Sequence, residues 1–231
     1  MTDNDKIKLT VDGYNQIAAM WDGTRRRNWT EVTEIIITEI QKLNVSSNIL
    51  DVGCGNARVL DEISEALAIK SIKYFGIDPS ESLITIAQSR YAKTNASFAV
   101  CDASNPLPFG EGWGGDAFDL IISTAVLHHV PRGMQKHWLL QVASLAKANS
   151  KLIFTIWHRS SDAQSFDIEK EEVEGFAQLE NIRYIYNFEK DELLSLFATC
   201  GLEVEAFTNL KRPNSNNENW LIVANKSATN L

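Results

Sequence analysis

The sequence predicts an α/β fold in which a mostly parallel sheet carries helices on both faces. Apolar runs of strand length alternate with helical segments between residues 48 and 158, as expected of a doubly wound sheet. A glycine turn, Asp51-Val52-Gly53-Cys54-Gly55, follows the first of these runs. Two further strand-like runs, Leu202–Phe207 and Asn219–Ala224, lie near the end of the chain on either side of a polar linker.

The glycine turn is typical of a loop that holds a nucleotide cofactor. Gly53 and Gly55 lack a Cβ atom, so the backbone can turn sharply and a ligand can approach the N-terminus of the next helix. Arg58 stands where the dinucleotide fingerprint requires a small residue, and no Gly-Lys-Ser/Thr follows as in a phosphate P-loop. The Asp51 carboxylate would repel a phosphate, but it could hold an ammonium group directly or through water.

Two later strands also end in a carboxylate. Tyr74–Asp78 follows the glycine turn after one helix, at the distance where doubly wound folds hold ribose hydroxyls, and Val100–Ala103 carries Asp102. A single strand-terminal Asp is often only a helix cap or a turn residue. Three in order, with one on the glycine turn, favour a binding role.

The Asp-x-Gly-x-Gly pattern resembles the first motif of class I S-adenosylmethionine (SAM) methyltransferases. The resemblance implies a Rossmann-like sheet of seven mostly parallel strands with the last one antiparallel, SAM as cofactor, and Asp102 accepting a hydrogen bond from the adenine amino group. It also implies a set of cofactor-binding residues: Tyr14, Arg25, Asp51, Gly53, Gly55, Asp78, Asp102, Ala103, Ser123 and Thr124.

The N-terminal segment, about residues 9–45, is expected to form a helical cap outside the sheet. Apolar side chains recur at helical spacing from about Leu9 to Trp21, and a second helix is expected from Thr30 to about Leu43. Three consecutive arginines, Arg25–Arg27, lie between these helices. They form either a solvated basic loop or a contact for an anion of the substrate or cofactor.

The remaining elements alternate along the chain. One helix is expected to end near Ile69, and further helices are expected to cover Pro79–Tyr91, Met134–Lys147 and Lys190–Thr199. The strands expected between them cover Ser97–Cys101, Phe118–Ser123 and Lys151–His158. The stretch from about 159 to 182 is acidic and lacks the apolar residues for a core of its own, so we expect a variable lid or loop there.

Imidazole and indole side chains gather at the expected carboxyl edge of the sheet, where ligands bind in such folds. His128 and His129 follow the strand that ends at Ser123, and Trp157 lies near the end of the next strand. Each histidine could line the pocket or act as a base. Trp157 could equally be a core residue.

Composition favours a single domain over residues 1–231 in a reducing cytoplasm. The three cysteines are too scattered for a zinc site or a disulfide framework, so no metal is expected. The acidic, polar first residues do not resemble a signal peptide, and no apolar run is long enough to cross a membrane. The formal charge of −8 lacks the basic excess usual for a protein that binds nucleic acid alone, and no DNA partner is expected.

A closer resemblance is to the tRNA wobble-uridine carboxymethyl methyltransferases, including the methyltransferase part of their AlkB-fused animal relatives. Four places carry it: Tyr14–Ala18 with Thr24-Arg25 and Trp29, the glycine turn through Asn56, Ala125–His129, and Asn219-Trp220. Two features depart from the family pattern. Thr30 stands where proline is usual, and the stretch from 159 to 181 is shorter and more acidic.

This resemblance implies that a carboxylate of a modified tRNA wobble uridine is converted to its methyl ester. A carboxylate is already ionised near neutral pH, so the protein needs no general base and must instead align the reacting atoms and exclude water. The implied catalytic residues are Arg25, which would hold an anion, His128 and Trp157. The implied substrate-binding residues are Trp29, His129, Asn219 and Trp220. A small zinc-binding activator subunit is the partner that the family suggests.

Two alternatives remain open. The same scaffold could methylate a small carboxylic acid, phenol or quinone precursor, because a fold does not fix a substrate. An enclosed pocket without a basic track would favour that reading. The chain could also be a SAM-binding subunit without activity, although Asp51, Asp78 and Asp102 argue against a lost cofactor site.

Overall fold

Seven strands form one sheet in the order β3-β2-β1-β4-β5-β9-β8. The structure is a computed structural model that describes residues 1–24, 30–102, 118–158, 164–171, 179–211 and 218–227. The first five strands of the sheet pair in parallel, whereas β9 is antiparallel to both of its neighbours. The strands are β1 (Asn48–Val52), β2 (Lys73–Asp78), β3 (Ala96–Val100), β4 (Phe118–Thr124), β5 (Ala146–His158), β8 (Leu202–Lys211) and β9 (Glu218–Lys226). This order confirms the expected sheet with its antiparallel last strand.

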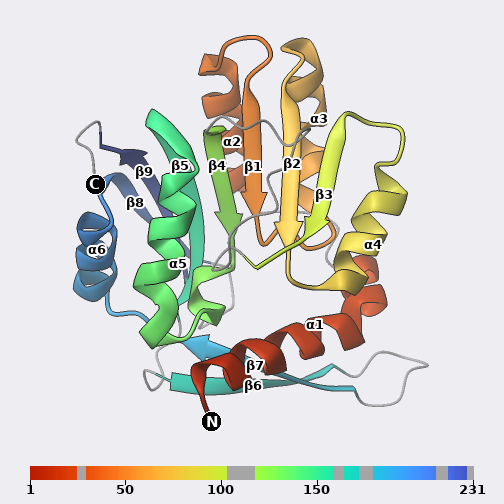
Figure 1. Ribbon diagram of the computed structural model, residues 1–231, viewed down its shortest axis with the longest axis vertical. Coiled ribbons are helices and arrows are strands. Elements are labelled where there is room, and N and C mark those ends of the chain that lie inside the picture. Colours follow the sequence, from red (N-terminus) through yellow and green to blue (C-terminus); the bar gives the residue numbers. More distant parts are fainter. Residues whose placement is uncertain (25–29, 103–117, 159–163, 172–178, 212–217, 228–231) are drawn as a thin grey trace.

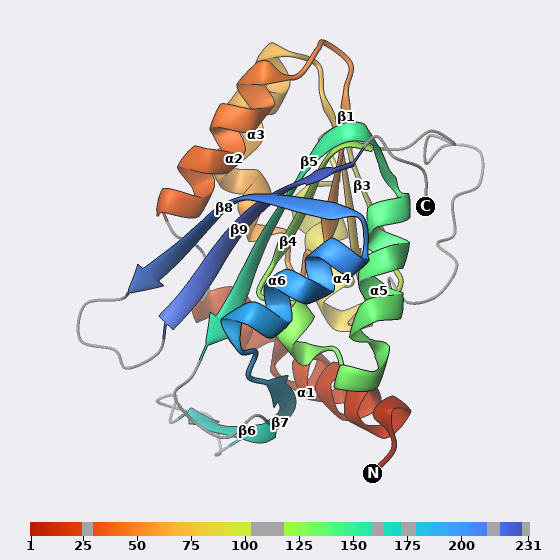
Figure 2. The same ribbon diagram turned by 90° about the vertical axis from the view of Figure 1, so that its left-hand side faces the viewer.

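Helices cover both faces of the sheet (Figure 2), and each face has its own apolar cluster. One cluster joins β-strand residues to Val32, Ile36 and Ile40 of α2 and to the buried side of α3. The other contains Trp138 of α5 and Phe197 of α6. The helices are α2 (Thr30–Lys42), α3 (Arg58–Ile69), α4 (Glu81–Arg90), α5 (Arg132–Ser144) and α6 (Lys190–Thr199).

Helix α1 (Asp3–Thr24) lies across the carboxyl ends of the parallel strands, and a second sheet lies beyond it (Figure 1). That sheet is the antiparallel pair β6 (Gln164–Glu171) and β7 (Leu179–Tyr186). The hydroxyl of Thr10 on α1 accepts a 3.1 Å hydrogen bond from the backbone N–H of Tyr184 on β7. Helix α1 is therefore held between the sheet edge and the β6–β7 hairpin.

Three expected boundaries were wrong. Helix α1 begins six residues earlier than Leu9, at Asp3, because its first two turns pack toward the hairpin, with Lys6 Nζ 4.9 Å from the Tyr184 ring. Helix α5 ends at Ser144 rather than Lys147, and β5 begins at Ala146, which pairs with Phe118 across the sheet. The stretch expected as a loop contains β6 and β7 instead. The two strands pair with each other and pack on α1, and these contacts stabilise a segment that lacks apolar residues for a core of its own.

No helix within the described part of the chain is long and apolar enough to cross a membrane.

Candidate functional site

The glycine turn follows β1 and is shaped by its neighbours on β2 and β4. Gly53 has a φ of 72°, and a Cβ atom there would lie 2.2 Å from Val126 Cγ2. Gly55 has a φ of 56°, and a Cβ atom there would make only an ordinary contact with Leu83 Cδ1 at 3.7 Å. Gly53 therefore serves close packing, whereas Gly55 serves the left-handed backbone of the turn at the start of α3.

Asp51 and Asp78 are buried beneath this turn. The Asp51 side chain is fully buried, accepts a hydrogen bond from the Tyr74 hydroxyl, and has one carboxylate oxygen without a partner among the described residues. Burial raises the pKa of Asp51 to about 7, opposed by the Tyr74 bond and reinforced by the charge of Asp78. An ammonium donor aimed at the free oxygen would satisfy it, which is the chemistry expected of this position.

Asp78 holds the glycine turn in place. Its two carboxylate oxygens accept backbone hydrogen bonds from Gly55 (2.9 Å) and Ser80 (2.8 Å). Burial raises the pKa of Asp78 to about 6, and these two bonds oppose the shift. The Asp78 oxygens retain further acceptor capacity, so the geometry remains compatible with the expected ribose contact.

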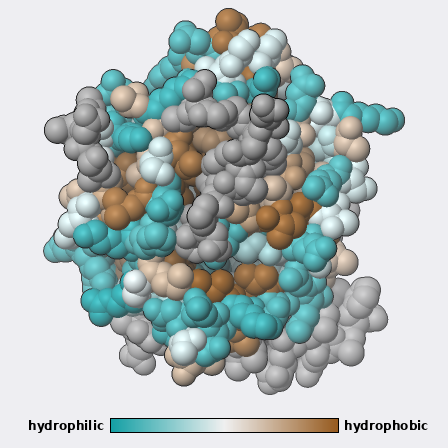
Figure 3. All heavy atoms as spheres, viewed as in Figure 1, coloured by the Kyte–Doolittle hydropathy of each residue, from teal (hydrophilic) through white to brown (hydrophobic). Residues whose placement is uncertain are grey.

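A pocket lies between the sheet edge and α1. The glycine turn contributes Gly53, the end of β3 contributes Asp102, and α1 contributes Val11. His129 and Trp138 form part of its wall on the α5 side. In the view of Figure 3, apolar residues are exposed at the surface just above α1. The pocket lies next to β1 and β4, where the strand order reverses and α/β folds bind ligands.

The turn after β4 brings the histidine pair to this pocket. Ala125 is left-handed with a φ of 60°, and its N–H donates to both the carbonyl and the hydroxyl oxygen of Thr155. A short 3₁₀ turn, Leu127–His129, follows directly. His129 reaches the pocket wall, whereas His128 is fully buried behind it.

His129 is held at both ring nitrogens. Nδ1 lies 2.7 Å from the Tyr184 carbonyl oxygen, which can only accept, so Nδ1 carries the proton. Nε2 lies 3.0 Å from the Tyr14 hydroxyl oxygen. The Arg183 guanidinium donates to that hydroxyl at 3.3 Å. This chain of bonds fixes the orientation of the His129 ring and ties α1 to β7.

Arg183 is a site residue that sequence reasoning missed. Its side chain is fully buried, and its guanidinium carbon lies 5.3 Å from the Tyr14 ring, 5.8 Å from Trp21 and 5.4 Å from Trp157. Such aromatic faces stabilise a cation that has left water. No local signal marks Arg183, because its neighbours come from α1 and β5.

The remaining aromatic predictions meet at the ends of β5 and β9. The Trp157 ring stacks on His128 with centroids 4.7 Å apart, and its backbone N–H donates to His128 Nδ1 at 3.3 Å. Asn219 pairs with Trp157 across the strands, while Trp220 stacks on His158 at 4.1 Å. Sequence reasoning did not single out His158.

Other predicted residues are only partly placed. Ser123 is buried, and its hydroxyl has no partner among the described residues; Thr124 is half-buried beside it at the end of β4. Arg25, Trp29 and Ala103 lie outside the described residues. Within the part of the chain that the structure describes, no group of three or more His, Cys, Asp or Glu side chains could hold a metal ion.

Comparisons with known proteins agree with this geometry. Residues 50–152 match the family model described as a methyltransferase domain. The chain is 31% identical over 145 residues to a tRNA (carboxymethyluridine(34)-5-O)-methyltransferase of Xenopus tropicalis, an alignment that covers 62% of this chain and 20% of that protein. It is 32% identical over 125 residues to a ubiquinone biosynthesis O-methyltransferase of Coxiella burnetii, covering 52% of this chain and 48% of that one. The chain thus spans about a fifth of the Xenopus relative and half of the Coxiella relative.

Solved structures share the fold. A magnesium protoporphyrin IX methyltransferase of Synechocystis with bound SAM superimposes with a TM-score of 0.68 at 14% identity, covering 98% of each chain. A methyltransferase complex with the activator Trm112 of Haloferax volcanii gives a TM-score of 0.66 at 17% identity, covering 96% of this chain and 99% of that one.

Residues 50–152 of the chain therefore match a methyltransferase domain, and the sheet has the Rossmann-like fold seen in class I SAM-dependent methyltransferases. Within that class the chain is similar to the tRNA carboxymethyluridine methyltransferases.

Proposed function

We propose that this chain methylates the carboxylate of a carboxymethylated wobble uridine in tRNA and so forms its methyl ester. The observation that carries the proposal is the pocket between α1 and the sheet edge: Gly53, Asp102, His129 and Trp138 line it, and Asp51 and Asp78 are buried under the adjoining glycine turn. The sequence similarity to enzymes named for this reaction supports the choice of acceptor.

The proposed cofactor residues bind different parts of SAM. Asp51 accepts from the ammonium end, Asp78 from the ribose and Asp102 from the adenine, while Tyr14, Arg25, Ala103, Ser123 and Thr124 complete the site. When bound, SAM supplies a methyl group on a positively charged sulfur. The unpartnered Asp51 oxygen and the pocket beside Gly53 and Asp102 fit that molecule.

The acceptor side needs alignment rather than a base. His129, whose ring is oriented by Tyr14 and the Tyr184 carbonyl, offers a wall of defined orientation, and apolar lining limits water. We propose that Arg25 holds an anion at the site, with Tyr14 and Trp29 closing over it. We propose that the acceptor binds on the side of Trp157, Asn219 and Trp220, where the fully buried His128 supports the Trp157 ring.

Arg25 gives a direct test of that role. Arg25→Ala is expected to lower turnover at least tenfold while the fold survives, because the anion loses its charge partner. Lys8→Ala, at an exposed lysine of α1 that pairs with Asp12, is the control. Near-normal turnover of Arg25→Ala would remove Arg25 from the mechanism.

The reaction is tested with methyl-labelled SAM and total tRNA that lacks the wobble ester, followed by mild alkali. An ester releases its label as methanol, whereas methyl groups on ring nitrogen or ribose oxygen stay on the tRNA. Release as methanol is the expected result. Label that stays on the tRNA would contradict the proposal.

An activator subunit is a second part of the proposal. The chain has a formal charge of −8, so a partner that adds tRNA contacts would offset its repulsion from phosphate. The Trm112 complex among the structural neighbours supports a small activator of that kind. Adding the host's zinc-binding subunit should raise tRNA methylation, and full activity of the isolated chain would defeat this part.

A small-molecule O-methyltransferase is the other candidate. The apolar pocket lining, the negative charge and the ubiquinone biosynthesis relative favour it. Methylation of a phenolic quinone precursor would support this candidate over the tRNA reaction if no label enters tRNA with or without the activator subunit.

A further inference from the structure

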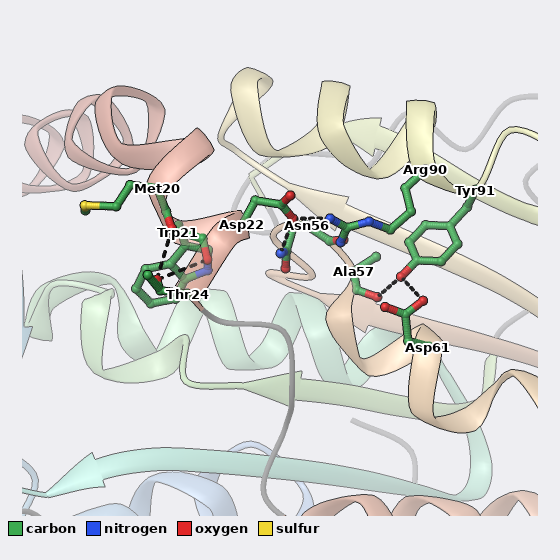
Figure 4. Close-up of polar contacts among 9 residues, drawn as sticks. All are labelled: Met20, Trp21, Asp22, Thr24, Asn56, Ala57, Asp61, Arg90 and Tyr91. Atoms are coloured by element: carbon green, nitrogen blue, oxygen red, sulfur yellow. Dashed lines mark hydrogen bonds and ion pairs between the residues drawn. The ribbon is translucent and has the colours of Figure 1, made fainter. Parts of the chain in front are cut away.

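The last turn of α1 is bonded to the cofactor turn through Asp22. One Asp22 carboxylate oxygen accepts a 2.8 Å hydrogen bond from the Asn56 side-chain amide and forms an ion pair with Arg90 at the end of α4. Figure 4 shows Asp22 facing both partners. The two charged side chains retain 22% and 28% of their exposure, so this pair is screened less than a fully exposed one.

The same end of α4 also holds the backbone of the turn. Arg90 donates to the Asn56 carbonyl at 3.4 Å, and the Tyr91 hydroxyl lies 3.1 Å from the Ala57 carbonyl and 2.8 Å from Asp61 (Figure 4). Two consecutive carbonyls that follow Gly55 are therefore held from outside the turn.

This turn needs such support because of its backbone conformation. Ala57 is left-handed with a φ of 56°, which costs free energy for a residue with a Cβ, and no side chain caps α3 at this position. Asn56 between Gly55 and Ala57 is 1% exposed, so its amide must find a partner inside the protein. Asp22 is that partner.

We propose that Asp22 and Arg90 are positioning residues that couple the docking of α1 to the shape of the cofactor turn. With the pair intact, α1 covers the pocket and Gly55 presents its ligand-facing side at the start of α3. With the pair broken, α1 docks less firmly and the turn leaves its strained conformation, so cofactor affinity falls. This role concerns cofactor binding and does not depend on the acceptor.

The test is a double-mutant cycle on the full chain, with S-adenosylhomocysteine affinity measured by calorimetry. Asp22→Ala and Arg90→Ala are each expected to weaken binding at least fivefold. The double variant should bind little more weakly than either single variant, because each substitution already breaks the Asp22–Arg90 pair. Asp22→Asn keeps an acceptor for Asn56 and should lie between wild type and Asp22→Ala. Asp12→Ala removes an exposed pair on the same helix and should bind as wild type does.

The melting temperature without ligand separates positioning from mere stability. If Asp22→Ala and Arg90→Ala lower it but bind S-adenosylhomocysteine normally, the proposal is overturned. Fully additive losses of affinity would also overturn it, since the two residues would then act separately. Should either alanine variant fail to fold, Asp22→Asn and Arg90→Lys carry the same comparison with smaller changes.

Discussion

Asp51 is the residue whose ionisation most affects this site. Its pKa is raised from 3.8 to about 7 by burial, so the folded protein without ligand holds a proton that the unfolded chain releases. The stabilisation from this proton is present below about pH 4 and is lost as pH rises through about 7. Wild type should therefore lose more stability than Asp51→Asn between about pH 5 and 8 in urea unfolding. Parallel curves for the two proteins would contradict the raised pKa.

The same proton affects ligand binding. An ammonium group bound by Asp51 favours the carboxylate, so binding should release a proton and S-adenosylhomocysteine affinity should rise between about pH 6 and 7.5. Calorimetry in buffers of different ionisation enthalpy measures both quantities. Asp51→Asn should bind weakly with little dependence on pH over this range. A wild-type affinity that falls as pH rises would exclude an ammonium contact.

Gly53 and Gly55 have different reasons to be glycine, and this difference is testable. A Cβ at position 53 would overlap Val126, whereas one at position 55 would make only an ordinary contact with Leu83. Gly53→Ala should cost at least about 3 kcal/mol of stability, from the clash and the left-handed backbone together. Gly55→Ala should cost roughly 1 kcal/mol. Chemical denaturation of both variants decides the matter, and equal losses would contradict the packing role of Gly53.

At this scale the sequence predicts residues that lie on one local pattern. Asp51, Gly53 and Asp78 could be found because each lies at the end of an apolar strand, next to the turn that leads into a helix. Arg183 could not, because the hydroxyl to which it donates belongs to Tyr14, 169 positions away. The role of Asp22 likewise depends on its contacts with Asn56 and Arg90, which lie close to it only in the folded chain.

Among the elements, α1 and the β6–β7 hairpin depend on each other. An isolated two-stranded hairpin is marginal in water, and this one gains support because Tyr184 and Ile185 are buried and the Tyr184 N–H donates to Thr10 of α1. The polar sequence of the hairpin predicts a loop, because the contacts that stabilise its strands come from α1, more than 150 positions earlier in the chain. The main sheet was predictable because its strands carry their own apolar residues.

The Thr10–Tyr184 bond offers a test of this dependence. Thr10→Val keeps the shape of the side chain but leaves the buried Tyr184 N–H without its acceptor, so the free energy of unfolding should fall by roughly 1–2 kcal/mol. Thr38→Val is the control, since the exposed Thr38 hydroxyl bonds only within its own helix at Glu34. Urea unfolding measures both. Equal small losses would mean that the hairpin gains nothing from this bond.

For the whole molecule, one arrangement accounts for the observations. The parallel strands bring three acidic positions and the histidine turn to one edge, and α1 lies over that edge (Figure 1). The sequence predicted this edge and its cofactor class, because both follow from strand order and the glycine turn. It did not predict how α1 is held there, since those contacts join distant segments.

The measurement that tests this account most directly is hydrogen–deuterium exchange of the full chain with and without S-adenosylhomocysteine. A ligand at the proposed edge should slow exchange together in α1 and in residues 51–57, and leave α6 unchanged, because α6 packs against the edge strand β8. Protection of both segments at the same ligand concentration is the predicted result. Binding that protects neither α1 nor the glycine turn would place the cofactor elsewhere and contradict the account.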